Sequence, residues 1–370
     1  MISMKNSLGS SVIVTIFGES HGPAVGAVID GLAPGIDVDM NFIASQLDLR
    51  RPYGKISTSR SEADDFSILS GVFEGKTTGT PVCIMIPNTA QKSRDYSATR
   101  TLARPGHADY TAYAKYHGFE DYRGGGHFSG RITAALTAAG AIAISALRGK
   151  GIMIGTHIAR LGGIDDRPFG QSEADLNKDI LILSEKRFAA LDESAAEAMR
   201  SAVAAAAEDG DSVGGVLETA VTGLEAGIGE PWFDTLESML AHGIFSIPGI
   251  KGIQFGGGFD MADAKGSEYN DPFCLADGKV RTATNNNGGI NGGISNGMPL
   301  IFRSAVKPTP SIYKEQQTVD FMERKDAVLS IHGRHDPAII HRARVVVDSV
   351  TALVLCDMLS MRYGTDWLAG

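Results

Sequence analysis

Two histidines lie in short glycine-containing segments next to charged or hydroxyl residues. His21 belongs to Phe17–Gly22 (FGESHG), and His107 belongs to Arg104–Tyr110 (RPGHADY). Histidine changes its charge near neutral pH, and glycine allows a backbone to approach a ligand closely. The two segments therefore indicate acid–base chemistry on an anionic small molecule.

The basic residues are grouped, although the chain is acidic overall. The formal net charge over 370 residues is −9, which argues against a general affinity for nucleic acid, because the phosphate backbone requires a basic face. The grouped residues are Arg50, Arg51, Lys55 and Arg60, followed by Arg104, Arg123 and Arg131. The grouping fits a site for a small anion, and it equally fits a solvated surface patch.

Two loops offer phosphate contacts. Residues 124–131 (GGGHFSGR) lead directly into an apolar segment of helical character, and free N–H groups at a helix N-terminus attract anions, with the dipole adding about 0.3–1 kcal/mol. This loop favours a phosphate or cofactor contact; the alternative is a turn that lets the helix pack tightly. Its spacing does not match the dinucleotide fingerprint of a Rossmann site. Lys307–Ser311 (KPTPS) presents a lysine and two hydroxyls and suits a second phosphate.

Three other motifs are weaker. Residues 18–22 match the G-x-S-x-G pattern of serine hydrolases, but that turn requires a following helix, and the residues after it favour a strand. Residues 71–77 are one residue short of a P-loop and are expected to form a turn between strands. Residues 332–336 (HGRHD) could ligate a metal, but Arg334 between the ligands would repel a cation. We therefore predict no metal site.

The elements that must position these residues alternate irregularly, which favours an α+β fold over a doubly wound one. Strands are predicted over Ser11–Phe17, Ala24–Ile29, Phe66–Phe73, Val82–Ile86, Ile152–Ala159, Val216–Val221, Lys251–Phe255 and Ile301–Val306. Helices are predicted over Asn41–Leu49, Gly130–Leu147, Ser194–Ala207, Phe233–Ala241 and Ser349–Met361. Asp39 is the expected N-cap of the first helix. Residues 165–177 and the glycine- and asparagine-rich stretch 256–296 are expected to be loops.

The three cysteines, Cys83, Cys274 and Cys356, lie far apart and have no metal-ligand spacing. Reduced thiols in a cytoplasmic protein fit this pattern best. The short apolar run near the N-terminus does not fit a signal peptide. We also expect no apolar run of membrane-spanning length.

Nine segments together resemble the chorismate synthase family over nearly the whole chain. They are residues 17–22 (FGESHG), 49–52 (LRRP), 69–79 (LSGVFEGKTTG), 95–97 (DYS), 104–110 (RPGHADY), 121–126 (DYRGGG), 288–295 (GGINGGIS), 307–309 (KPT) and 333–337 (GRHDP). They occur in the family's order. The resemblance implies a lyase of the shikimate pathway to aromatic amino acids. This enzyme eliminates phosphate and a ring hydrogen from 5-enolpyruvylshikimate 3-phosphate in a 1,4-anti sense, with reduced FMN and no net redox change.

The resemblance also implies roles for individual residues. His21 would protonate the departing phosphate, His107 would stabilise the reduced flavin near N1, and Asp336 would handle the proton at flavin N5. Substrate anions would be held by Arg50, Arg51, Lys55, Arg104 and Arg131. The cofactor would be held by His127, Phe128, Ser129, Gly292, Lys307, Pro308, Thr309, Pro310, Ser311 and Arg334. His127 and Phe128 stand where many family members have arginine and serine.

The family's fold implies antiparallel sheets packed around a helical layer, in a single catalytic domain spanning residues 1–370 that assembles as a homotetramer. Two alternatives remain open. A flavoprotein oxidoreductase, or an accompanying NAD(P)H-dependent flavin reductase activity, would need a nicotinamide site, for which the sequence has no motif. A non-catalytic phosphate-binding protein would need the arginines but not the two loop histidines and Asp336.

Overall fold

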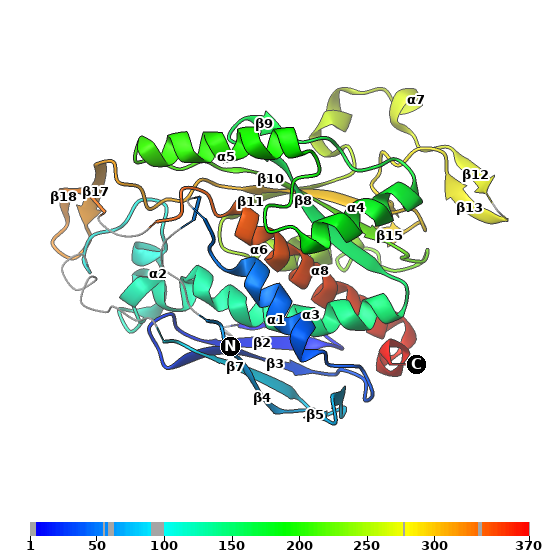
Figure 1. Ribbon diagram of the computed structural model, residues 1–370, viewed down its shortest axis with the longest axis horizontal. Helices are drawn as coiled ribbons and strands as arrows, with labels where there is room; N and C mark the ends of the chain where they lie inside the picture. Colours follow the sequence, from blue (N-terminus) through cyan, green and yellow to red (C-terminus); the bar gives the residue numbers. More distant parts are fainter. Residues whose placement is uncertain are drawn as a thin grey trace.

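The computed structural model describes residues 5–54, 56–57, 63–89, 100–276, 278–331 and 335–369. Two antiparallel five-stranded sheets enclose a layer of helices (Figure 1). The first sheet has the order β1-β2-β3-β7-β4, and the second has the order β11-β16-β10-β8-β9. The expected α+β architecture, with a helical layer between antiparallel sheets, is therefore confirmed.

The first sheet consists of β1 (Ser7–Leu8), β2 (Ile13–Gly18), β3 (Ala24–Asp30), β7 (Val82–Pro87) and β4 (Ser67–Ser70). The second consists of β11 (Ile250–Phe255), β16 (Leu300–Val306), β10 (Gly215–Thr222), β8 (Met153–Leu161) and β9 (Ile164–Asp165). Alternation of buried and partly exposed residues along β7 and β16 shows why these runs form strands with one face in the core.

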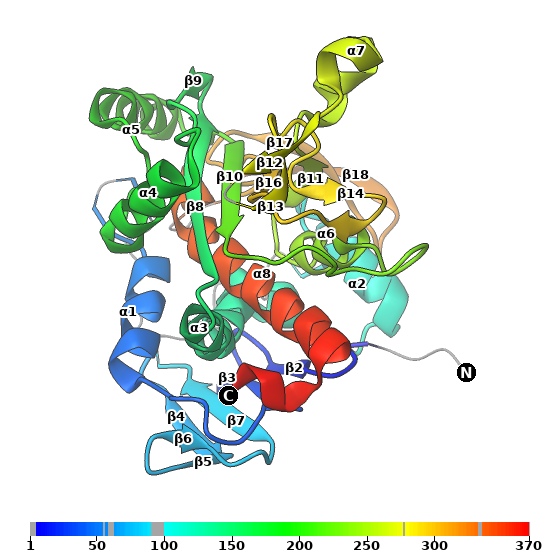
Figure 2. The same ribbon diagram turned by 90° about the vertical axis from the view of Figure 1, so that its right-hand side faces the viewer.

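The middle layer consists of α1 (Met40–Arg50), α3 (Thr133–Gly149) and α8 (Ile340–Tyr363), with α6 (Leu236–Phe245) beside α8. Figure 2 shows α3 and α8 running between the two sheets, while α4 (Glu173–Glu185) and α5 (Glu193–Glu208) lie beyond the second sheet. Asp39 caps α1 as predicted, by accepting hydrogen bonds from Asn41 N and Phe42 N. A Cβ on Gly140 would lie 2.2 Å from Ser349 Cβ, so glycine allows α3 and α8 to pack closely.

The remaining elements are short. They are β5 (Val72–Phe73), β6 (Lys76–Thr77), α2 (Asp109–Tyr116), α7 (Gly266–Tyr269), β12 (Phe273–Ala276), β13 (Lys279–Thr282), β14 (Ile290–Asn291), β15 (Ile294–Ser295), β17 (Gln316–Asp320) and β18 (Lys325–Leu329), with 3₁₀ turns at Arg123–Phe128, Gly130–Ile132, Gly258–Asp263 and Thr365–Leu368. The P-loop-like segment is the β5–β6 hairpin, so the predicted turn is confirmed.

Four expectations about the elements are wrong. The strand predicted over Phe66–Phe73 is divided at Gly71, which has a φ of +80°. Helix α4 begins at Glu173 inside the expected loop 165–177, because Ser172 caps it by accepting a hydrogen bond from Asp175 N. The stretch 256–296 contains short helices and two hairpins. Helix α8 begins nine residues before the predicted start, because buried polar side chains interrupt its apolar pattern.

The segment Gly130–Gly149 is long and apolar enough to cross a membrane, contrary to the expectation from the sequence. However, 89 % of its most apolar window is buried inside the protein, as in the core helix of a globular fold. Among the described residues it is the single helix that meets this criterion of length and composition.

Candidate functional site

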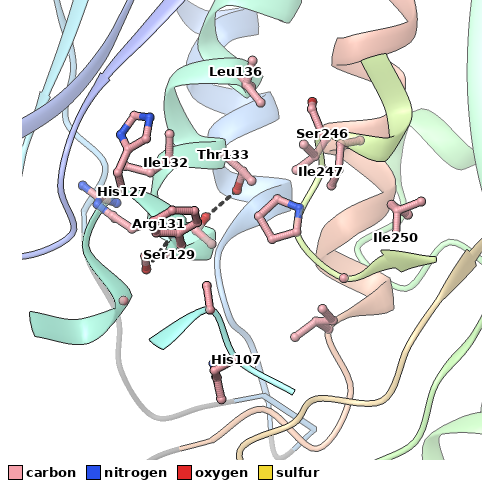
Figure 3. A pocket seen from close by; sticks show the side chains of 18 of the residues that line it. His107, His127, Ser129, Arg131, Ile132, Thr133, Leu136, Ser246, Ile247 and Ile250 are labelled. Carbon is pink, nitrogen blue, oxygen red and sulfur yellow. Dashed lines mark hydrogen bonds between the residues drawn. The ribbon is translucent and has the colours of Figure 1, made fainter. Parts of the chain in front are cut away.

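A cavity of about 930 Å³ lies where segments 104–109 and 123–133 meet α1, α6 and the start of α8. Ligand cavities commonly measure about 300–1,000 Å³, so this one has room for more than one small molecule. Figure 3 shows His127 and Arg131 on one side, the apolar Ile247 and Ile250 across the gap, and His107 below them.

His21 lies in the turn between β2 and β3 and is 4 % exposed. Its Nδ1 is 3.0 Å from Ser20 Oγ, and the Ser20 hydroxyl lies 3.1 Å from the Gly124 carbonyl. A Cβ on Gly124 would be 2.2 Å from His21 Cε1, so the turn requires glycine there. Gly124 lines the cavity and His21 does not. The strand after the turn excludes the nucleophile elbow of a serine hydrolase.

The glycine-rich loop turns sharply before α3, as the sequence predicts. Its three consecutive glycines, 124–126, have φ values of +59°, +83° and +51°. Ser129 then accepts a hydrogen bond from Arg131 N, at the 3₁₀ turn that leads into α3. His127 donates from Nδ1 to the Gly18 carbonyl at 2.7 Å, and Phe128 is 43 % exposed on the cavity wall.

Three arginines of the cavity wall converge on one carboxylate. Asp64 accepts from Arg50 Nη2 at 3.0 Å, pairs with Arg131 through its other oxygen, and lies 4.0 Å from Arg51 Nε. Burial lowers the pKa of Arg50 to about 10. Burial alone would raise the pKa of Asp64, but the guanidinium groups of Arg50 and Arg131 outweigh it and hold that pKa below its usual range.

The loops 104–110 and 307–311 form one unit. His107 Nε2 is 2.7 Å from Ser311 Oγ, and Lys307 Nζ donates to the Gly106 carbonyl at 2.6 Å. A Cβ on Gly106, which has a φ of +71°, would lie 2.8 Å from Pro310 Cβ. Glycine therefore allows the two loops to meet, although they are 200 residues apart in the sequence.

The charge of His107 is set by its surroundings. Burial and, to a smaller extent, the neighbouring Arg104 cation lower its pKa to about 4. Arg104 makes a two-pronged ion pair with Asp109, with distances of 2.8 and 2.7 Å. Thr309 lines the cavity, and its Oγ1 is buried without a hydrogen-bond partner among the described residues.

Asp336 lines the cavity and pairs with Arg342 of α8 at 2.6 Å. Arg342 also donates from Nε to the Arg50 carbonyl at 2.9 Å. Arg342 therefore connects Asp336, the carboxylate that the resemblance places at the flavin, to the arginine cluster. Sequence reasoning missed Arg342 and Asp64. Asp64 stands next to Asp65, and Arg342 stands next to His341, so neither residue is distinguished by its local sequence.

The structure brings most of the predicted residues to one cavity. Its wall includes Arg50, Arg51, Arg104, His107, His127, Phe128, Ser129, Arg131, Lys307, Thr309, Pro310 and Asp336. Pro308 and Ser311 belong to the 307–311 loop without lining the cavity, and Gly292 lies in the turn of the β14–β15 hairpin, away from its wall. Lys55, Arg60 and Arg334 lie outside the described residues, as does part of the metal motif at 332–336. Within the described residues, no group of three His, Cys, Asp or Glu side chains could hold a metal ion.

An α+β sandwich with an arginine-rich cavity is a fold and site suited to polyanionic small molecules. The sequence model of the family "Chorismate synthase" matches residues 12–360. Similar curated proteins include the chorismate synthase of Dehalococcoides mccartyi (46 % identity over 98 % of each chain) and that of Pyrococcus abyssi (45 % identity over 96 % of this chain and 97 % of the relative).

A solved structure described as the crystal structure of chorismate synthase superposes with a TM-score of 0.77. Its sequence identity is 27 %, over 97 % of this chain and 94 % of the other. The chain belongs to the chorismate synthase family.

Proposed function

We propose that the protein is an enzyme that converts 5-enolpyruvylshikimate 3-phosphate to chorismate by 1,4-anti elimination of phosphate, in the shikimate pathway. The observation that carries the proposal is the match to the family along residues 12–360, together with a cationic cavity lined by residues of several motif segments, including 49–52, 104–110 and 121–126. The substrate has a phosphate and two carboxylates. Guanidinium groups bind such anions with charge-assisted, often two-pronged hydrogen bonds.

The cavity residues fit reduced FMN as the cofactor. The unpartnered Thr309 hydroxyl and the Lys307 ammonium group lie on one loop beside His107, and a phosphate would satisfy that hydroxyl. We assign cofactor binding to this loop, to the segment 127–129 and to Arg334, and we assign no contact in this cavity to Gly292, which lies away from its wall. When bound, reduced FMN supplies the electron-rich ring that takes up the substrate hydrogen, and it is regenerated without net redox change.

The chain's own residues supply position, charge and protons. Arg50, Arg51 and Arg131 form the substrate-anion wall around Asp64, and we extend that wall with Arg104 and Lys55. Arg342 holds the Asp336 carboxylate, to which we assign the proton at flavin N5. His107 is neutral in the cavity near pH 7, so it can donate or accept a hydrogen bond beside an electron-rich ring without bringing a full charge.

His21 is the proposed general acid for the leaving phosphate. Its ring lies one backbone layer behind the cavity wall, next to Gly124. The assignment therefore requires the segment 124–126 to move when substrate binds. Three consecutive glycines permit such a change of backbone conformation at low cost.

We further propose that the enzyme is a carbon–oxygen lyase with a single catalytic domain over residues 1–370. It would act in the cytoplasm as a homotetramer. The proposals about reaction class, domain, compartment and oligomeric state rest on what the resemblance to the family implies. An NAD(P)H-dependent flavin reductase activity in the same chain is a separate question that the assay below can address.

The direct test mixes protein, photoreduced FMN and 5-enolpyruvylshikimate 3-phosphate without oxygen, and follows chorismate absorbance and phosphate release. We expect equal amounts of both products, and none with oxidised FMN. Absence of product despite tight FMN binding would contradict the proposal. Adding NADPH with oxidised FMN in a parallel reaction tests for flavin reductase activity.

The roles of the histidines are tested by His21→Ala and His107→Ala. Loss of a proton-transferring group typically costs about 10²- to 10⁴-fold in turnover, and we expect each variant to fall in that range with its fold retained. His117→Asn is the matched control, because His117 is exposed, lies outside the cavity and has a φ of +58°, which asparagine tolerates. Near-normal turnover in either alanine variant would refute the role assigned to that residue.

A further inference from the structure

Asn88 follows β7 directly and touches two parts of the site at once. Its Nδ2 donates to the Glu19 carbonyl at 2.9 Å and to the Gly22 carbonyl at 2.8 Å, one on each side of His21. Its Oδ1 accepts from Arg131 Nε at 2.9 Å. All three bonds cross between segments that are distant in the sequence.

The backbone around Asn88 strengthens the same connection. Asn88 N donates to the Pro23 carbonyl at 3.0 Å, and the Pro87 carbonyl accepts from Arg131 Nη2 at 3.1 Å. The turn that carries His21 and the guanidinium group of Arg131 are therefore fixed to the same two residues. Asn88 itself does not line the cavity, and the hydrogen bonds described above all join it to protein groups.

A carboxamide is the side chain best matched to this position. It offers two N–H donors for two carbonyls and one oxygen acceptor for a guanidinium group. A carboxylate would keep the acceptor and lose both donors. Alanine would lose all three.

We propose that Asn88 is a positioning residue for the reaction, which fixes the His21 turn and the Arg131 guanidinium group relative to one another. The inference rests on the proposed chorismate synthase activity. Its consequence is that the two halves of the carboxamide have separable effects. The amide nitrogen acts on turnover through His21, and the amide oxygen acts on substrate affinity through Arg131.

Two substitutions separate these effects. Asn88→Asp keeps the bond to Arg131 and places a carboxylate oxygen against two carbonyls, which releases the His21 turn. A small displacement of a catalytic group can cost about 10²-fold, so we expect kcat to fall by about that factor with KM within about twofold of the wild type. Asn88→Ala also frees Arg131, and we expect the same fall in kcat together with an increase in KM of about tenfold.

The matched control is Asn177→Ala. Asn177 is a half-buried asparagine of α4, accepts a hydrogen bond from the Thr222 hydroxyl, and lies outside the cavity. We expect its kcat and KM to equal those of the wild type. Circular dichroism and FMN binding establish that each variant is folded, and Asn88→Ser replaces Asn88→Ala if the alanine variant unfolds.

The outcomes are distinct. A folded wild type without chorismate formation refutes the proposed function. If the wild type is active, the inference is supported when kcat falls in both Asn88 variants and KM increases only in Asn88→Ala. Values for both Asn88 variants within twofold of Asn177→Ala overturn it, as does a fall in kcat with identical KM values in Asn88→Asp and Asn88→Ala.

Discussion

The protein has two largely buried clusters of charged side chains that differ in how completely their buried polar atoms are paired. The cavity cluster consists of Arg50, Arg51, Asp64 and Arg131. The sheet cluster consists of His157, Asp166, Glu218 and Arg303. Every member of the cavity cluster lines the cavity, and no member of the sheet cluster does.

In the sheet cluster, no buried side-chain nitrogen or oxygen lacks a hydrogen-bond partner among the described residues. His157 bonds Asp166 through Nδ1 at 2.9 Å and Glu218 through Nε2 at 3.0 Å, while Glu218 accepts from Arg303 at 2.7 Å. Glu218 faces His157 and Arg303 in the registers of β10 with β8 and β16, so the ladder itself aligns the charges. Burial alone would lower the pKa of His157, but its hydrogen bonds to the two carboxylates outweigh burial and raise it.

The cavity cluster is less complete. Arg50 is 6 % exposed, yet its Nε has no hydrogen-bond partner among the described residues. Leaving a buried donor unpaired costs free energy, about 1–3 kcal/mol for a typical group. A structural cluster would be expected to avoid that cost, as the sheet cluster does. The contrast is consistent with the proposed anion-binding role of the cavity cluster, and with a sheet cluster that holds three strands together.

The largest expected effect comes from removing the central carboxylate of each cluster. Asp64→Asn should lower the free energy of unfolding by about 3–5 kcal/mol, because it leaves the buried guanidinium groups of Arg50 and Arg131 without their carboxylate. Glu218→Gln should lower it by less, because His157 keeps its bond to Asp166 and the Arg303 side chain is 42 % exposed. Inorganic phosphate can enter the cavity, so it should restore part of the lost free energy of unfolding in Asp64→Asn but not in Glu218→Gln. Urea unfolding with and without phosphate measures both effects.

A phosphate concentration of ten times Kd stabilises a folded state by about 1.4 kcal/mol if phosphate does not bind the unfolded chain. This is the recovery in the free energy of unfolding that we expect for Asp64→Asn. Chloride at matched ionic strength is the control for general salt effects. If phosphate stabilised both variants equally, the distinction between an anion-receiving and a structural cluster would be lost.

The second effect concerns the pH dependence of the sheet cluster. His157→Gln should lower the free energy of unfolding by about 1.5–3 kcal/mol at pH 5.5, through loss of charged hydrogen bonds. The folded pKa of His157 is raised above its unfolded value of 6.5, so its contribution is complete below pH 6.5 and is lost as the pH rises through the folded pKa.

The carboxylates define the acid limit of the same window. Burial alone would raise the pKa values of Glu218 and Asp166, but their hydrogen bonds to His157 and other groups hold them below the ordinary values of 4.5 and 3.8. Their contributions are therefore complete above those ordinary values and are lost at lower pH. Unfolding experiments from pH 4 to 9 should show the largest difference between wild type and His157→Gln between about pH 4.5 and 6.5. A difference that stayed constant up to pH 9 would mean that His157 is not charged in the folded protein.

Local signals in the sequence predicted most of the strands and helices and the α+β class, whereas the layered fold and most of the cavity residues were implied by the resemblance to the family. Alternating apolar residues located β2, β3, β7 and β16, and an almost wholly apolar run located α3. The start of α8 was missed because His341, Arg344 and Asp348 are polar yet buried. Arg344 is accommodated there by the carbonyls of Leu183 and Lys186, which no local pattern reveals.

The residues that connect the site could not be predicted for the same reason. Asp64, Asn88 and Arg342 belong to none of the glycine-rich motifs, and each acts through contacts that are distant in the sequence. Asn88 meets Glu19 and Gly22 across 69 and 66 residues, for example. The motifs identified the groups suited to chemistry. The side chains that hold those groups in place became apparent only when the two sheets and the helical layer were assembled.

The third effect contrasts His107 of the cavity with His157 of the sheet. The folded pKa of His107 is about 4, so below pH 6.5 the unfolded chain takes up a proton that the folded chain does not, and stability falls as the pH drops toward 4. An anionic ligand should raise this pKa by about 1–3, since an opposite charge favours the imidazolium form. An NMR titration with and without FMN measures the pKa of His107, and the signal missing from the His107→Gln variant identifies its resonance. An unchanged pKa with FMN bound would place the FMN anion away from His107.

The smallest expected effect tests whether the contribution of the two clusters to the free energy of unfolding depends on burial or on the presence of an ion pair alone. Lys76 and Asp37 form an ion pair of 2.5 Å, with side chains that are 54 % and 82 % exposed. Exposed pairs contribute about 0–1 kcal/mol, because water screens the charges and ordering two flexible side chains costs entropy. Asp37→Asn should therefore shift the free energy of unfolding by less than about 1 kcal/mol, by urea unfolding at low salt. A loss comparable to that of Asp64→Asn would show that the pairing itself, regardless of burial, determines the cost, and the contrast between the clusters would then need another explanation.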